Sequence, residues 1–128
     1  MKGSWQDTLN LGSKLSIKKV WNIAKTLSSF YVSKWKGMPS HWGLPFSISI
    51  EPTTACNLRC PECPSGLRAF TRPTGLLQED LYKKIVDELA DYLVYLILYF
   101  QGEPYLHPKF FELVEYAAQK NIYTATST

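Results

Sequence analysis

The chain has 128 residues and a formal net charge of +3, from 14 basic and 11 acidic side chains. A chain of this length forms one domain at most, and so small an excess of positive charge gives no indication of nucleic-acid binding. The first residues lack the apolar run of a secretory signal, and the apolar stretch at residues 93–100 is far too short to cross a bilayer. We therefore expect a cytoplasmic protein without nucleic-acid partners.

Residues 1–44 predict a basic, amphipathic helical extension. Seven lysines precede the first predicted strand: Lys2, Lys14, Lys18, Lys19, Lys25, Lys34 and Lys36. Apolar residues recur there at helical spacing: Ile17, Val20, Trp21, Ala24, Leu27, Tyr31 and Trp35. The Met38-Pro39 step ends this helix, or pair of helices. Because an apolar stripe on a helix usually faces a core, we expect it to pack across the following domain as a cap or as an element that precedes its barrel. Contact with an anionic membrane surface is the alternative.

A short strand and a cysteine-bearing loop come next. Residues 45–52 alternate apolar and polar side chains and end at a proline, as a strand should. The loop at residues 53–65 carries the chain's three cysteines, Cys56, Cys60 and Cys63. Iron–sulfur clusters normally have four cysteine ligands. Three thiolates can therefore hold one face of a cluster and leave one metal open to a substrate or cofactor.

Several other interpretations of the cysteines stay open at this point. An odd count without a secretory signal disfavours disulfides. A structural zinc site needs a fourth ligand, for which the chain offers only His41 and His107. Buried cysteines without a ligand role are uncommon on a loop interrupted by prolines. A non-catalytic iron–sulfur protein for electron transfer would call for a fourth cysteine.

Helices and strands alternate after the loop. Residues 78–91 predict a helix, and residues 93–100 a strand covered on both faces. A second helix is predicted around residues 110–117, and a third strand over residues 122–126. The expected buried stripe of the first helix is Leu81, Ile85, Val86 and Leu89. This order predicts an α/β fold with parallel strands and right-handed crossovers.

Polar residues near the loop have two interpretations each. Arg68 and Arg72 follow the cysteines on a turn-rich segment, where they would hold a carboxylate or phosphate, or else only face solvent. His107 precedes a predicted helix, and a capping or exposed role is favoured over general-base chemistry.

Two motifs together resemble a known family. Residues 56–63, Cys-Asn-Leu-Arg-Cys-Pro-Glu-Cys, are similar to the cluster loop of radical S-adenosylmethionine (SAM) enzymes. Residues 99–104, Tyr-Phe-Gln-Gly-Glu-Pro, resemble the family's Gly-Gly-Glu-Pro turn after the second barrel strand. The stretch is closest to the subgroup that often carries a cysteine-rich C-terminal domain called SPASM. Glu62 and Gln101 depart from the pattern, which usually has an aromatic residue and a glycine there.

The resemblance implies a set of ligands and a reaction class. Cys56, Cys60 and Cys63 would hold a 4Fe–4S cluster, and Gly102, Glu103 and Thr126 would contact SAM. The cluster and SAM would yield a 5′-deoxyadenosyl radical that abstracts hydrogen from a small-molecule or peptide substrate, with an electron donor as a further partner. No residue of the chain is assigned a catalytic role of its own.

The resemblance also implies an incomplete core. Residues 45–128 would form the first three strands of a partial (β/α)6 barrel, so the chain resembles the front part of a longer protein. We expect the isolated chain to be inactive or weakly active.

Overall fold

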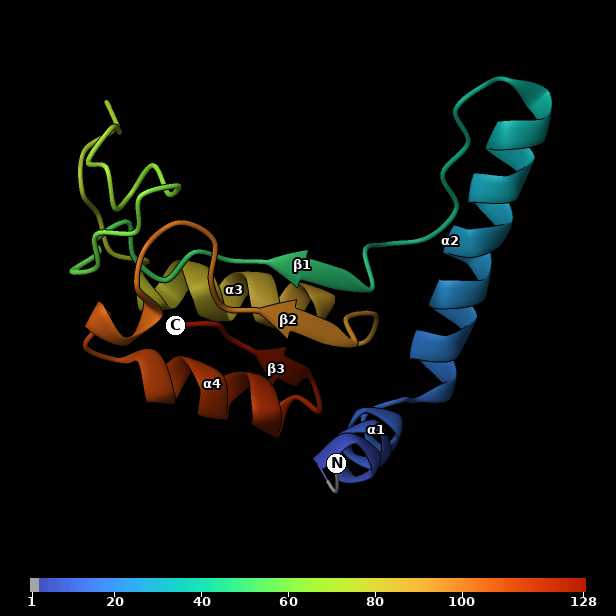
Figure 1. The fold of residues 1–128 in the computed structure, drawn as a ribbon. Helices are drawn as coiled ribbons and strands as arrows, with labels where there is room; N and C mark the ends of the chain where they lie inside the picture. The colour runs from blue at the N-terminus through green and yellow to red at the C-terminus, as the bar shows by residue number, and fades with distance from the viewer. Residues whose placement is uncertain (1–2) are drawn as a thin grey trace.

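The computed structural model describes residues 3–128 (Figure 1). The helices are α1 (Gly3–Ser13), α2 (Ile17–Lys36), α3 (Glu79–Leu89) and α4 (Phe110–Gln119), with a 3-10 turn η1 (Pro104–Leu106). The strands are β1 (Ser47–Ser49), β2 (Tyr95–Ile97) and β3 (Tyr123–Ala125). Every strand and helix predicted after residue 44 is present, in the predicted order. Lys2 lies outside the described residues.

The three strands form one parallel sheet in the order β1-β2-β3. Ser47 pairs with Tyr95, and Tyr95 in turn with Tyr123, so the first residues of the three strands are in register. Parallel pairing places the C-terminal ends of all three strands at the same end of the sheet, where the loops after β1 and β2 meet. The prediction of an α/β fold with parallel strands is confirmed.

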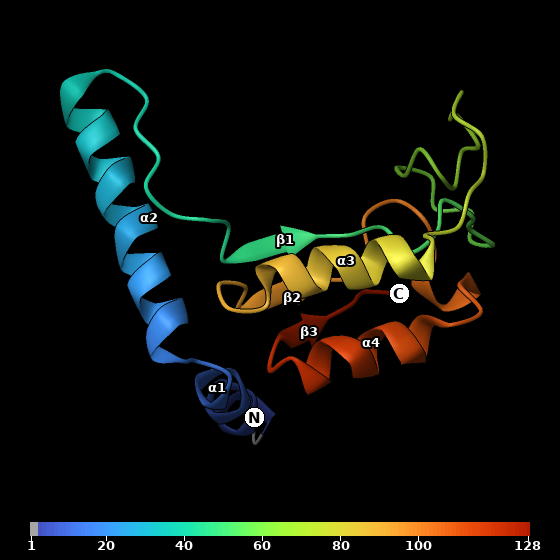
Figure 2. The same ribbon diagram turned by 180° about the vertical axis from the view of Figure 1, so that it is seen from behind.

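Helices α3 and α4 cover one face of this sheet and pack against each other (Figure 2). The fully buried Tyr82 of α3 donates a hydrogen bond from its hydroxyl to the Leu113 carbonyl of α4 at 2.7 Å. The core contains Tyr82, Val86, Leu93, Leu96, Leu98, Phe110, Leu113, Ala117 and Ile122. Leu81 was wrongly placed in the buried stripe, because the helix turns Tyr82 inward and leaves Leu81 52% exposed.

The opposite face of the sheet is only partly covered. Leu96 of β2 points into the core, whereas Tyr95 and Ile97 on the other face are half-buried. The Tyr95 ring stacks on Tyr123, with ring centroids 5.2 Å apart. The prediction of a strand covered on both faces is therefore wrong for β2, since both helices lie on one side.

Helix α2 stands away from the sheet, beyond the N-terminal ends of the strands (Figures 1 and 2). It begins at the Ser16 cap and ends at Gly37, which has the left-handed conformation that favours glycine. Its buried residues are polar: Lys19, Asn22 and Ser29. The apolar stripe faces outward instead, so the prediction that it packs as a cap on the domain is wrong.

Hydrogen bonds explain this orientation of α2. The Asn22 side chain donates to the Leu44 carbonyl and accepts from the Leu44 N–H, at 2.8 and 2.9 Å. Ser33 binds the backbone of Ser40 in the same way. The returning segment at residues 40–44 therefore occupies the polar side of the helix. No helix in the part of the chain that the structure describes is long and apolar enough to span a bilayer.

Candidate functional site

The cysteine loop leaves the C-terminal end of β1 and returns at residues 75–77 to lie beside residues 52–54. Two segments at its base are tied together by threonine side chains. The Thr53 hydroxyl donates to the Gly75 carbonyl at 3.0 Å, and the Gly75 N–H donates to the Thr54 hydroxyl at 2.7 Å. A backbone bridge joins Thr53 and Leu76. The loop is thus closed at its base, at the end of the sheet farthest from α2 (Figure 1).

The three cysteines are free thiols within reach of solvent. Cys60 is exposed, and Cys56 and Cys63 are half-buried. A turn links Cys60 and Cys63, in which the Cys63 N–H donates to the Cys60 carbonyl at 3.2 Å. A side chain at Gly66 would collide with the Cys60 backbone, so glycine is needed for this turn. Hydrogen bonds from the backbone of Gly66 and then Ser65 lower the pKa of the Cys63 thiol.

The cysteines are not drawn together around a common point. Among residues 3–128, no three His, Cys, Asp or Glu side chains are grouped closely enough to hold a metal ion. Their chemistry still fits the cluster, because three accessible thiols stand on one loop and one has a lowered pKa. Metal binding commonly completes the folding of such loops.

The turn after β2 packs directly on the cysteine loop. The Glu103 N–H donates to the Ala55 carbonyl at 2.8 Å. A Cβ at Gly102 would collide with the Thr53 carbonyl, so glycine lets these two backbones touch. Glu103 is buried, and its carboxylate lies 3.5 Å from the Tyr105 N–H at the start of η1. Gly102 and Glu103 therefore lie at the same end of the sheet as the cysteines.

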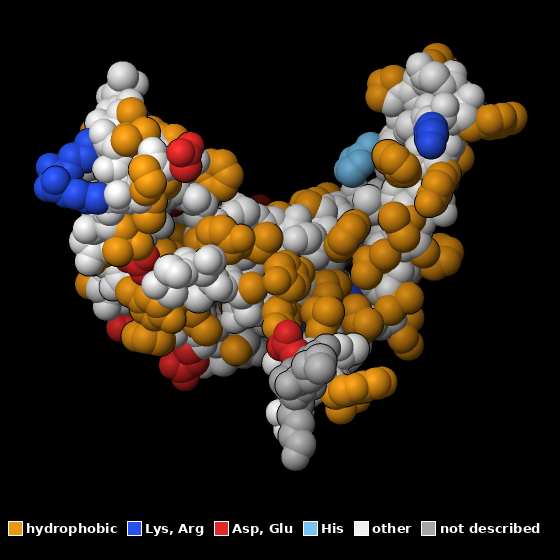
Figure 3. All heavy atoms as spheres, viewed as in Figure 1, with side chains coloured by type: hydrophobic (Ala, Val, Ile, Leu, Met, Phe, Trp, Pro, Cys, Tyr) orange, Lys and Arg blue, Asp and Glu red, His pale blue; other side chains and the backbone are white. Residues whose placement is uncertain are grey.

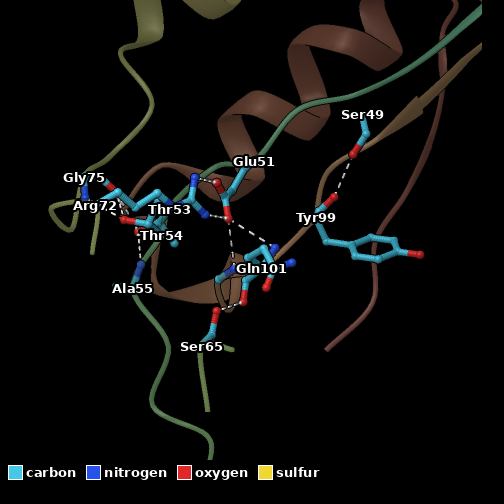
Figure 4. A network of polar contacts seen from close by, with 11 residues as sticks. Ser49, Glu51, Thr53, Thr54, Ala55, Ser65, Arg72, Gly75, Tyr99 and Gln101 are labelled. Carbon is cyan, nitrogen blue, oxygen red and sulfur yellow. Dashed lines mark hydrogen bonds and ion pairs between the residues drawn. The ribbon is translucent and has the colours of Figure 1, made fainter. Parts of the chain in front are cut away.

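Glu51 holds this turn in place, and sequence reasoning missed it. Its Oε1 atom accepts hydrogen bonds from the Gln101 and Gly102 N–H groups, at 3.1 and 3.2 Å. Its Oε2 atom lies 2.9 Å from Arg72 Nη1, so one carboxylate joins β1, the turn and the loop (Figure 4). The only sequence signal was a carboxylate directly after a strand and before Pro52.

The two arginines of the loop have different surroundings. Arg72 is paired with Glu51 and stacks over the Phe70 ring, with its guanidinium carbon 4.7 Å from the ring centroid. It therefore serves the structure of the loop more than a ligand. Both arginines line a cavity of about 330 Å³ beside Cys56, but Arg68 has no ion pair among the described residues.

Gln101 and Glu62, the two departures from the family pattern, also differ in their surroundings. The Gln101 backbone carbonyl accepts a hydrogen bond from the Ser65 hydroxyl, which ties the turn to the loop a second time. The side-chain Oε1 atom of Gln101 is buried and has no hydrogen-bond partner among the described residues. Unsatisfied buried acceptors are rare and call for a ligand or water. Glu62 is exposed on the cysteine loop.

Thr126 and His107 have backbone partners. The Thr126 hydroxyl donates to the Leu98 carbonyl at 3.1 Å, directly beyond β3 and at the same end of the sheet as the turn. His107 is buried; its Nδ1 atom accepts from the Lys109 N–H at 3.2 Å, and its Nε2 atom lies 3.1 Å from the Leu77 carbonyl. Because Nδ1 accepts, Nε2 must carry the proton. His107 therefore ties Leu77 to the residue before α4; it is not exposed, and α4 has no side-chain cap hydrogen bond.

These features define a parallel α/β domain with a cysteine loop and a Gly-Glu-Pro turn packed together at the C-terminal end of its strands. Residues 50–128 match the family model described as the radical SAM superfamily. The chain belongs to this superfamily.

Curated relatives agree with this assignment. The chain is 30% identical over 93 residues to a PqqA peptide cyclase of Bradyrhizobium diazoefficiens, covering 73% of this chain and 24% of that protein. It is 37% identical over 84 residues to the mycofactocin maturase MftC of Mycobacterium tuberculosis, covering 66% and 21%. The chain thus spans about a quarter of the length of the relatives it matches.

A solved structure shares the fold. The structure of BtrN in complex with AdoMet and 2-DOIA superposes with a TM-score of 0.58. The match covers 65% of this chain and 35% of BtrN, at 24% sequence identity. The arrangement of strands and helices is therefore shared with part of BtrN.

Proposed function

We propose that the chain binds a 4Fe–4S cluster through Cys56, Cys60 and Cys63, and SAM beside it at the turn that contains Gly102 and Glu103. The contact between this turn and the cysteine loop, from Glu103 N–H to the Ala55 carbonyl, carries the proposal. It holds the two motifs against each other at the end of the sheet where α/β folds bind ligands. In this family the cluster and SAM together supply a 5′-deoxyadenosyl radical for hydrogen abstraction.

The residues of the chain contribute binding and orientation. Glu51 fixes the backbone of Gln101 and Gly102, and so sets where the turn stands relative to the loop. Glu103 and the unpartnered Oε1 of Gln101 provide acceptors for the ammonium group of SAM. Thr126 adds a hydroxyl at the end of β3. The metal-bound chemistry belongs to the cofactors, and the protein supplies their placement.

The substrate class follows from the relatives' names. One relative is named as a peptide cyclase and another as a maturase of mycofactocin. We infer a peptide as the substrate class, with a small molecule as the alternative, and a separate protein or reductant as the electron donor. The cavity beside Cys56, which Arg68 lines, is the part of the chain where such a substrate would approach the cluster.

Anaerobic reconstitution with iron and sulfide tests the cluster. The purified chain should turn brown and hold about four irons, as the cluster type requires. Cys60→Ala should lose most of this iron because a ligand is removed, whereas Ser49→Ala, on the open face of β1, should retain it. Stoichiometric zinc without visible absorbance would contradict the proposal and favour a zinc-stabilised binding module.

SAM binding to the reconstituted protein tests the turn. Glu103→Gln should weaken SAM affinity by roughly tenfold, because hydrogen bonds to a charged group are worth about 1.5–3 kcal/mol. The iron content should stay unchanged, since Glu103 is not a cluster ligand in this proposal. Equilibrium dialysis with labelled SAM measures the affinity. If Glu103→Gln binds SAM with unchanged affinity, SAM does not contact Glu103 and the proposed position of SAM at this turn is wrong.

A further inference from the structure

Helix α2 carries an apolar face that the structure leaves uncovered. We call the residues that form it the outer face: Ile17, Val20, Trp21, Leu27, Tyr31 and Trp35. Ile17 is 90% exposed, Trp35 84% and Trp21 66%. In Figure 3 hydrophobic side chains cover much of the visible side of this helix. Contiguous exposed apolar surface of this kind marks an interaction site.

The helix cannot bury the outer face by turning over. Its other side is held by Asn22 and Ser33, whose side chains bond to the segment at residues 40–44. Lys19 is buried at the same side, and its Nζ atom donates to the Asn121 carbonyl at 2.6 Å. Rotation would break these bonds and leave buried polar groups without partners. The outer face is therefore fixed toward the surroundings.

The lysines beside the outer face indicate which kind of partner it binds. Between Asp7 and Glu51 the sequence has six lysines and no acidic residue. At 100° per residue, Lys25 and Lys36 stand at one border of the outer face and Lys34 at the other. An apolar, aromatic face bordered by lysines is the pattern of a helix that lies in the interface of an anionic bilayer. Protein partners seldom require lysine, which is depleted at their interfaces.

We propose that α2 lies flat on an anionic lipid surface, with the outer face inserted among the acyl chains and Lys25, Lys34 and Lys36 at the headgroups. A hollow lined by Leu15, Ile17, Val20 and Trp21 adds apolar surface at the start of the helix. The cysteine loop lies at the opposite end of the sheet, so this attachment leaves the proposed cluster site open (Figure 1). The site proposed above is not needed for this inference.

Vesicle binding of the 128-residue chain tests the proposal. Vesicles of phosphatidylcholine with phosphatidylglycerol should bind the chain, and vesicles of phosphatidylcholine alone should bind it far more weakly. The four tryptophans, Trp5, Trp21, Trp35 and Trp42, are all exposed. Their emission should therefore shift to the blue on anionic vesicles, and high salt should reverse the binding.

Two variants with matched controls locate the contact. Trp21→Ser with Trp35→Ser should weaken vesicle partitioning at least about tenfold. Replacing Lys25, Lys34 and Lys36 by glutamine should weaken it about fivefold for each lysine near the surface. Phe111→Ser and Lys84→Gln change exposed residues on other helices and should change little. Far-UV circular dichroism checks that each variant is folded.

Three results would overturn the proposal. They are failure to bind anionic vesicles, equal binding to neutral vesicles, and full binding by the Trp21→Ser, Trp35→Ser variant. A lipid-free dimer that dissociates in this variant, in sedimentation equilibrium, would assign the outer face to a second copy of the chain.

Discussion

Glu51 shows how one side chain organises the candidate site. Its side chain is only 15% exposed, and it binds two backbone N–H groups of the turn as well as Arg72. Without Glu51, these two N–H groups would bind water, and the turn would be held less firmly against the cysteine loop. The residue thus acts on the site through the positions of Gln101 and Gly102.

Substitution separates the two roles of Glu51. Glu51→Ala leaves the Gln101 and Gly102 amides without their acceptor, and we expect a loss of about 1–3 kcal/mol in the free energy of unfolding. Glu51→Gln keeps an acceptor and loses only the ion pair with Arg72, whose side chain is 43% exposed. A partly exposed pair contributes roughly 0–1 kcal/mol. Urea unfolding measures the stability of both variants. Equal losses of stability would show that the hydrogen bonds from the Gln101 and Gly102 N–H groups to Glu51 are unimportant.

At the scale of elements, an ion-pair cluster joins the starts of α3 and α4. Glu79, in the first turn of α3, lies 2.6 Å from Lys109 Nζ and 2.5 Å from Lys83 Nζ. Lys109 precedes α4, so the pair ties the two helices together where both begin. The hydrogen bonds from Lys109 and then Lys83 lower the pKa of Glu79 to about 2.

This lowered pKa predicts an acid-dependent contribution to stability. A carboxylate whose pKa is lower in the folded state stabilises the fold above its ordinary pKa of 4.5, and this contribution is lost as the pH falls toward 2. We therefore expect Glu79→Gln to be less stable than the parent chain at pH 6, with a difference that shrinks between pH 4.5 and 2. Urea unfolding across that range measures it.

Glu88→Gln is the matched control for Glu79. Glu88 lies on the same helix and makes no ion pair among the residues that the structure describes. Its substitution should give a smaller difference in stability that depends less on pH. A Glu79→Gln effect that persists unchanged near pH 2 would mean that the ion pairs do not stabilise the fold.

The sequence allowed the order of elements to be predicted, because each strand and helix after residue 44 has its own periodicity. Contacts between distant segments were beyond it. Glu51 meets Gly102 across 51 positions, and no local pattern marks that pairing. The side toward which the apolar stripe of α2 faces was mispredicted for a related reason. An apolar stripe usually faces a core, but here the polar side of α2 faces the chain instead, because its side chains form hydrogen bonds with the segment at residues 40–44.

For the candidate site, the motifs indicated the residues and the relation between them. The turn and the cysteine loop lie together, as the two motifs in sequence order led us to expect. Leu81 illustrates a smaller failure, since a shift of one position turned Tyr82 into the core instead. Helical periodicity alone leaves such shifts unresolved when an aromatic residue adjoins the stripe.

At the scale of the whole molecule, the sheet has an open edge at β3. Among the described residues, β3 pairs only with β2. Unpaired edges invite pairing with other strands. Three strands also cannot enclose a ligand between them, so SAM would contact this chain from one side only.

We therefore expect the 128-residue chain to be a poor catalyst even when it holds a cluster. Oriented contact can supply about 7–11 kcal/mol of barrier lowering, much of which is lost when a ligand is held from one side. Reconstituted protein with SAM and a strong reductant should form little more 5′-deoxyadenosine than a free-cluster control. Multiple turnovers well above that control would show that three strands suffice.

The contacts of the N-terminal helices set an order of events during synthesis. Asp7 accepts a hydrogen bond from the Tyr123 hydroxyl, 116 positions later, and Lys19 binds the carbonyl of Asn121, 102 positions later. A growing chain emerges from the ribosome with α1 and α2 first, more than a hundred residues before their partners. Throughout that interval Lys19, which is buried in the folded chain, has no Asn121 carbonyl to bond, and α2 is not yet tied to the segment between α4 and β3. Nascent chains halted before residue 121 lack β3 and the core residue Ile122, so they should attract chaperones more strongly than the released protein.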